Sequence, residues 1–239
     1  DLQTLLGYAD ETCWGLVGPG GLNAFEGLSR KVEDADEPAA SSNSAEDAWL
    51  EEAKMEAAKE SIAVISLGST PSTVQAFKKV DISREASPFD SVTTSVKGLI
   101  DCLQTDFKGF SAAHPQVAES SVEYFSGLLS KSHRAKLFVC AVEAAEDLGA
   151  VADLLAALKS RFSGQMCLLV IVCGQAQARL VSVEDHYNVL AHFISGGLKA
   201  DGSTLCEPIR QSLDWVIGKP VQASVVKDFE SLRALAEAH

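Results

Sequence analysis

The chain has 239 residues, of which 46% are hydrophobic, and a formal net charge of −13. That length and apolar content allow one large domain or two small ones with a real core. The longest apolar run, Met166–Cys173, has eight residues, whereas a helix needs about 20 to span a bilayer. We therefore expect no membrane insertion.

The negative charge is concentrated at the N-terminus. Residues 1–60 carry −10, residues 61–130 carry −2 and residues 131–239 carry −1. A uniformly acidic protein would repel nucleic acid. An acidic tail on a nearly neutral body does not exclude nucleic-acid binding, but it provides no basic patch either.

Residues 1–44 are glycine-rich and then acidic, which predicts an extended arm or linker. The sequence starts at Asp1 without a methionine or a targeting pattern, so we expect a fragment or a chain from which a targeting segment was removed. The glycines lack the Gly-Lys-Ser/Thr ending of a phosphate-binding loop. The arm is nevertheless apolar enough to dock on a protein surface, and its candidate docking residues are Leu5, Leu6, Trp14, Leu16 and Phe25.

Residues 45–130 are predicted to be a helical segment. Residues 45–61 are rich in Ala, Glu and Lys, which favour helices. Ser87-Pro88 resembles a helix start, and apolar residues follow at spacings of three and four as far as Phe107. A second helix is expected from His114-Pro115, and the two should form an antiparallel pair.

Residues 131–239 are predicted to form an α/β domain, which makes the fold class mixed α+β. Two apolar segments, 136–142 and 166–173, are predicted to be strands. The segment between them has apolar residues at helical spacing, so the three are predicted to form a parallel β-α-β unit. We expect residues 178–183 to form an antiparallel neighbour of that unit. Further helices are predicted at about 186–195, ended by Gly196-Gly197, at about 205–216 and at 227–238.

The sequence reveals no catalytic or metal-binding pattern, and we expect no cofactor. Four of the six cysteines (Cys102, Cys140, Cys167 and Cys173) lie in apolar segments, where a thiol behaves as a small hydrophobe. Without paired spacing they indicate a reducing compartment, either generally intracellular or an organelle. Glu184, His186 and His192 lack the spacing of a zinc site, so a solvated loop is the favoured interpretation. An enzyme with a site converging on these three residues is the disfavoured alternative.

Residues 88–239, and most clearly 136–239, resemble the C-terminal region of alanyl-tRNA synthetases. The resemblance is carried, in chain order, by Lys136–Val139, Leu154–Lys159, Gly197-Leu198-Lys199-Ala200, Asp214–Lys219, Gln222-Ala223-Ser224 and Leu232–Glu237. It implies a non-catalytic domain that self-associates and helps to hold tRNA.

The chain departs from that family at the turn Gly218-Lys219-Pro220-Val221. The family's glycine cluster is missing there, and Pro220 has no backbone N–H, so the turn should grip a phosphate poorly. The candidate nucleic-acid contacts are Lys199, Arg210, Lys219 and Lys227, with ordinary surface charges as the favoured interpretation.

The sequence therefore predicts a non-catalytic interaction or assembly protein, an accessory or structural subunit that docks on a protein partner in a larger complex through its N-terminal arm. Self-association is compatible with this hypothesis. The alternative is a tRNA-binding and oligomerising appendage of an alanyl-tRNA synthetase, in which tRNA is a disfavoured partner.

Overall fold

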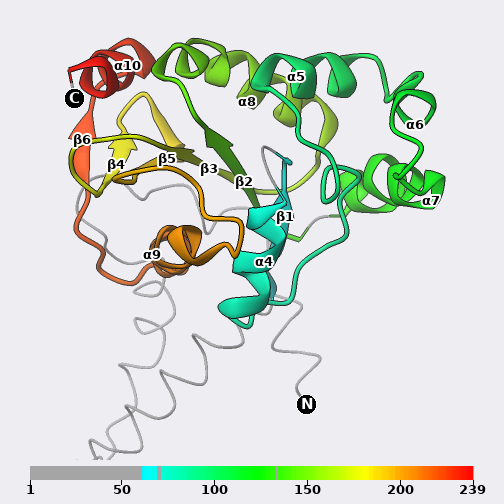
Figure 1. Cartoon of the computed structure of the whole chain (residues 1–239), viewed down its shortest axis with the longest axis horizontal. Coiled ribbons are helices and arrows are strands. Elements are labelled where there is room, and N and C mark those ends of the chain that lie inside the picture. The colour runs from blue at the N-terminus through cyan, green and yellow to red at the C-terminus, as the bar shows by residue number, and fades with distance from the viewer. Residues whose placement is uncertain (1–60, 69–70, 133, 239) are drawn as a thin grey trace, which may run out of the picture.

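A computed structural model describes residues 61–68, 71–132 and 134–238. The proposed docking residues of the arm and the predicted helix at 45–61 lie outside this range, apart from Ser61. The described chain contains a six-stranded sheet with helices on both faces (Figure 1). This confirms the predicted mixed α+β class.

The sheet has the strand order β1-β2-β3-β5-β4-β6. Its strands are β1 (Ala63–Ser66), β2 (Lys136–Val142), β3 (Met166–Val172), β4 (Arg179–Val183), β5 (His186–Phe193) and β6 (Ser224–Val226). The pairs β1–β2, β2–β3, β3–β5 and β4–β6 are parallel, and β4–β5 is antiparallel. The central strands are buried on both faces, as their continuous apolar sequences require.

Two hydrophobic layers cover the sheet. On one face lie α5 (Val96–Gln104), α8 (Val151–Arg161) and α10 (Phe229–Glu237), and on the other lie α4 (Ser72–Lys79) and α9 (Cys206–Val216) (Figure 1). The shorter elements are α6 (Phe110–Ala113), α7 (Glu119–Glu123), the π-helix η1 (Tyr124–Leu129) and the 3-10 helices η2 (Ala145–Ala150) and η3 (Ser203–Leu205). No helix in the described part is long and apolar enough to cross a bilayer.

The predicted β-α-β unit is confirmed as β2-α8-β3, whose strands pair in parallel from Lys136–Met166 to Val142–Val172. The predicted helix at 186–195 is wrong, because residues 186–193 form β5. The antiparallel neighbour predicted at 178–183 exists as β4, but it pairs with β5. Strand β1 was not predicted.

The helix predicted to start at Ser87-Pro88 begins later than expected. Helix α5 starts at Val96, where the Ser95 side chain accepts a hydrogen bond from the Gly98 N–H. The second predicted helix begins at Glu119 rather than at His114 and widens into the π-helix η1. Residues 87–94 are thereby left as a non-helical segment that packs against the end of β1.

Candidate functional site at the carboxyl end of β1

A left-handed glycine begins the turn that leaves β1. Gly68 has φ +66°, and a Cβ built on it would lie 2.4 Å from the Cβ of Phe89 and 2.6 Å from the Phe89 carbonyl oxygen. Both the backbone conformation and the contact exclude a side chain. Only glycine at position 68 therefore allows residues 87–94 to pack this closely against the turn.

Residues 87–94, which we call the wrapping segment, are fixed to the turn by backbone and side-chain contacts. The Thr94 N–H donates to the Gly68 carbonyl oxygen at 2.9 Å. Phe89 is fully buried, and its ring centroid lies 5.5–5.8 Å from those of Phe107, Phe110 and Phe125. Such tilted and edge-on ring packing stabilises the arrangement beyond simple burial, so the polar groups of the wrapping segment have defined positions.

Asp90 is held by only one of its two carboxylate oxygens. Its Oδ2 accepts from the Arg84 guanidinium and from the Ser87 N–H, the latter at 3.2 Å. Its Oδ1 is buried and, like the buried Oγ1 of Thr94, has no hydrogen-bond partner among the described residues. A buried oxygen without a partner costs about 1–3 kcal/mol. The wrapping segment thus contains a buried acceptor and a buried hydroxyl group whose hydrogen-bonding capacity the described residues leave unused.

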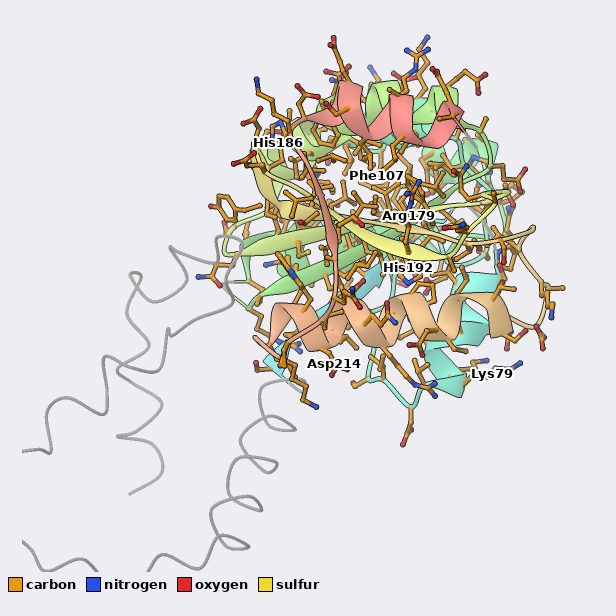
Figure 2. The ribbon with its side chains drawn as sticks, turned by 90° about the vertical axis from the view of Figure 1, so that its left-hand side faces the viewer. Lys79, Phe107, Arg179, His186, His192 and Asp214 are labelled. Atoms are coloured by element: carbon orange, nitrogen blue, oxygen red, sulfur yellow. The ribbon has the colours of Figure 1, made fainter. Side chains whose placement is uncertain are left out.

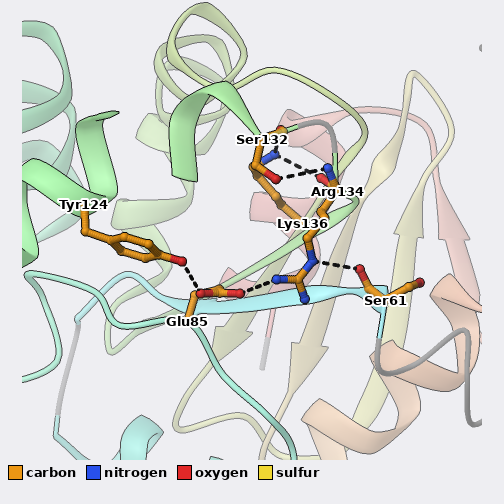
Figure 3. A network of polar contacts seen from close by, with 6 residues as sticks. All are labelled: Ser61, Glu85, Tyr124, Ser132, Arg134 and Lys136. Carbon is orange, nitrogen blue, oxygen red and sulfur yellow. Dashed lines mark hydrogen bonds and ion pairs between the residues drawn. The ribbon is translucent and has the colours of Figure 1, made fainter. Parts of the chain in front are cut away.

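A second polar cluster lies along β1 and at the amino ends of β1 and β2, at the end of these strands opposite to Gly68 (Figure 3). The Glu85 carboxylate accepts from the Tyr124 hydroxyl and from the Arg134 guanidinium, while Arg134 Nε donates to the Ser61 carbonyl oxygen at 3.3 Å. The hydrogen bond to Glu85 and burial raise the pKa of Tyr124. Because the Glu85 N–H also donates to Val64 at 2.9 Å, the cluster fixes the outer edge of β1.

Lys136 is a buried cation at the amino end of β2. Its Nζ donates to the carbonyl oxygens of Ser132, Arg134 and Ser163, the last two at 3.0 and 2.7 Å. The ammonium has three donors, so all of them are used. Burial and the nearby Arg134 charge lower the pKa of Lys136. This group is a structural clamp with no donor left for a ligand.

Three of the described cysteines, Cys102, Cys167 and Cys173, have a raised pKa and do not present a ready thiolate. Burial raises the pKa of Cys167 to about 12, and burial with the nearby Glu143 raises that of Cys173 to about 11. Burial and Asp101 also raise the pKa of Cys102, which is half-buried on α5. A reactive thiolate needs a positive partner that lowers its pKa. Cys140 is 1% exposed within β2, so the strand cysteines have the core positions that the sequence predicted.

The histidine and acidic residues considered in the sequence lie apart from the turn. The His186 ring stacks on Phe229 with centroids 4.6 Å apart. His192 lies on the face of the sheet that α9 covers (Figure 2), with Nε2 3.0 Å from Gln211 Oε1 and Nδ1 3.1 Å from the Phe193 carbonyl oxygen. Burial lowers the pKa of His192 more than these two contacts raise it. No His, Cys, Asp and Glu group in the described ranges could hold a metal ion.

The basic residues considered for nucleic acid lie at separate places on the surface. Lys199, Arg210 and Lys227 are exposed, and Lys219 Nζ lies 3.5 Å from an Asp214 carboxylate oxygen. At the turn itself, the Gly218 and Lys219 N–H groups donate to carbonyl oxygens of α9 at 3.1 and 2.8 Å. They close the helix in the way that left-handed glycines commonly do, so these amides are already used.

The geometry above defines a mixed α/β protein with a polar site where a glycine turn leaves the first described strand. A family model described as "Putative papain-like cysteine peptidase (DUF1796)" matches residues 62–141, about a third of the chain. That range holds β1, Gly68 and the whole wrapping segment. No curated protein and no solved structure matches the chain significantly.

This match corrects three hypotheses drawn from the sequence. The resemblance to the alanyl-tRNA synthetase C-terminal region is wrong, since the family model that matches is the one described as a putative papain-like cysteine peptidase. The same finding contradicts the expectation of a non-catalytic assembly protein or tRNA-binding appendage, and the expectation that the chain is not an enzyme. The resemblance rested on residues 88–239, whereas the family match begins at residue 62, in a part of the predicted helical segment 45–130 that in fact holds β1 and the non-helical residues 87–94.

Proposed function

We propose that this chain is a hydrolase that cleaves peptide amide bonds, and that it holds its substrate at the Gly68 turn. One observation carries the proposal: the segment that matches the model of a family described as a putative papain-like cysteine peptidase also contains the buried Asp90 Oδ1 and Thr94 Oγ1, which have no partner among the described residues. A peptide offers an N–H donor for the carboxylate and a carbonyl acceptor for the hydroxyl group. The match and the two oxygens are independent of each other.

The proposed reaction is acyl transfer to water. A nucleophile attacks the carbonyl carbon of the scissile amide, the C–N bond breaks and the leaving nitrogen takes a proton. Water then attacks the acyl intermediate and releases the acid. In this proposal Asp90 Oδ1, which Arg84 and the Ser87 N–H leave unoccupied, accepts from a proton donor or from the substrate N–H.

If a cysteine is the nucleophile, the pKa of its thiol sets how the reaction rate depends on pH. Of the two cysteines in the matched range, Cys140 is buried in β2 and Cys102 is half-buried. The pKa of Cys102 is raised, so its thiolate fraction at neutral pH is smaller than that of a free cysteine and increases with pH. If Cys102 is the nucleophile, turnover therefore rises into the alkaline range.

The test is hydrolysis of a fluorogenic peptide library by the full chain, with matched variants. Thr94→Val removes the unpartnered hydroxyl group while keeping the shape, and Thr93→Val does the same at the exposed neighbour. We expect Thr94→Val to lower kcat/KM at least tenfold, Asp90→Asn to lower it by about 100-fold, and Thr93→Val to leave it unchanged. Equal rates in all four proteins, or no turnover above the blank from pH 5 to 10, would refute the proposal.

Two further variants locate the nucleophile. Cys102→Ser changes the half-buried cysteine of the matched range, and Cys206→Ser changes a cysteine of similar exposure outside it. Loss of turnover in Cys102→Ser alone would assign the nucleophile to the matched range. Full turnover in both variants would assign it to a group other than these thiols, which labelling with hydroxyl-directed and thiol-directed reagents would then identify.

A further inference from the structure

A cavity of about 440 Å³ lies where the turn after α5 meets α6, α7 and η1. Figure 1 shows these short helices side by side at one end of the molecule, beyond the edge of the sheet at β1. The cavity is lined by Asp106, Phe107, Gly109, Ser111, Ala112, Glu119, Val122, Glu123 and Ser126. We call it the acidic pocket. Its volume is in the range that holds small ligands or single side chains.

The rim of the acidic pocket carries three carboxylates from two separate segments. Asp106 comes from the turn after α5, while Glu119 and Glu123 lie four residues apart on α7. Arg161 pairs with Asp106, whereas Glu119 and Glu123 form no ion pair with any described residue. Like charges at this helical spacing repel each other, and a cation placed between them would relieve that repulsion.

The floor of the acidic pocket is apolar and rigid. Phe107 is 5% exposed, and its ring packs against Phe89, Phe110 and Phe125 with centroid distances of 5.5–5.6 Å. Val122 adds a partly buried apolar side chain. A ring fixed by three others cannot move away from a ligand without disturbing that cluster, and the small part of it that stays exposed, together with Val122, offers an apolar contact for methylene groups.

A cationic side chain of the protein already contacts the apolar floor of the pocket. The Arg161 guanidinium lies over the Phe107 ring, 5.9 Å from its centroid, while pairing with Asp106. Cations favour such positions over aromatic faces. Phe107 and a carboxylate of the rim therefore already hold one cationic side chain, and Glu119 and Glu123 offer the same charge to a second one.

We propose that the acidic pocket binds the lysine or arginine side chain of a peptide, with its methylenes against Phe107 and Val122 and its cation at Glu119 and Glu123. The peptide identity of the ligand rests on the proposed function. The pocket is linked to the glycine turn through direct packing, because Phe107 contacts Phe89 and Phe89 contacts Gly68.

The test is a binding titration of the full chain, read from NMR chemical shifts without any turnover. The probes are a tetrapeptide containing one lysine, the same peptide with norleucine in place of lysine, and n-butylammonium. The variants are Glu119→Gln/Glu123→Gln and a control, Glu146→Gln, which removes an exposed carboxylate on η2. Low ionic strength keeps the exposed charges effective.

We expect the lysine peptide to bind at least tenfold more tightly than the norleucine peptide. The double variant should lose this preference, and Glu146→Gln should keep it. Equal affinity for the two peptides, or an undiminished preference in the double variant, would overturn the pocket assignment. Butylammonium binding as tightly as the lysine peptide would overturn the peptide assignment. If the lysine preference is found but no peptide is cleaved, the pocket stands and the proposed hydrolase fails.

Discussion

Replacing Gly68 by alanine should destabilise the protein strongly, because two separate costs act at this position. A left-handed backbone costs about 1–2 kcal/mol for a residue with a Cβ. The new Cβ would also lie 2.4 Å from Phe89 Cβ, 2.6 Å from the Phe89 carbonyl oxygen and 2.9 Å from that of Val92. Two of these are backbone atoms that cannot rotate away, and overpacking of this kind costs about 1–3 kcal/mol.

Gly218→Ala is the matched control for this substitution. Gly218 has φ +83°, but a Cβ built there would meet nothing within 4 Å, so only the backbone cost of about 1–2 kcal/mol applies. Gly68→Ala should therefore lower the free energy of unfolding by about 2–5 kcal/mol in total. At a typical slope of about 2 kcal/mol/M, its urea midpoint should fall by roughly 1–2.5 M.

The assay is urea unfolding of the full chain, followed by circular dichroism, for the wild type and both variants. We expect Gly68→Ala to shift the midpoint clearly further than Gly218→Ala, with unchanged slopes. Equal shifts in the two variants would show that the wrapping segment does not press on the turn, and the site geometry derived above would be wrong.

Three other changes test the polar groups around the sheet. Lys136→Met should lower the free energy of unfolding by about 1–3 kcal/mol in urea denaturation, since it leaves three partly buried carbonyl oxygens without their donor; an unchanged midpoint would contradict the clamp. Burial lowers the pKa of His192 in the folded state. As the pH falls below about 6.5, the imidazole of the unfolded chain is therefore protonated before that of the folded protein. The free energy of unfolding should decrease with pH over this range. His192→Asn should flatten that part of a urea-midpoint profile from pH 7 to 5, and a profile identical to the wild type would exclude His192 as its cause. Glu85→Gln should lower the pKa of Tyr124 towards that of free tyrosine, because its hydrogen bond to Glu85 is the largest cause of the raised value; an ultraviolet absorbance titration, with Tyr124→Phe to assign the signal, would show no shift if the bond were absent.

The core of the sheet was predictable because its strands are short, apolar and bounded by breakers. Residues 136–142 and 166–172 are buried almost throughout, so a continuous apolar run was a sufficient signal. Residues 186–193 gave a false helix prediction, because only the second half of β5 is buried and its Ala and Leu content favours helix as well as strand. Tertiary pairing with β3 and β4 decides that segment, and local propensity does not record pairing.

The candidate site was missed for a different reason. The contact between Gly68 and Phe89 joins positions that are 21 residues apart, and single-sequence patterns report only local periodicity. Phe89 and Val92 share the spacing of the α5 stripe, although α5 begins at Val96, so two residues of a packed turn looked like the start of a helix. The sequence did contain one usable pattern. A short apolar segment followed by Gly68 and Pro71 is typical of a strand that ends in a tight connection, where glycine can adopt a left-handed conformation.

The measurement that tests the central claim most directly is the ratio of peptide-hydrolysis rates between the wild type and Thr94→Val, with Thr93→Val beside them. A site built around the unpartnered Thr94 hydroxyl group predicts a loss of tenfold or more for Thr94→Val and none for Thr93→Val. Equal rates for these three proteins, measured on a peptide that the wild type cleaves, would place the chemistry elsewhere in the chain.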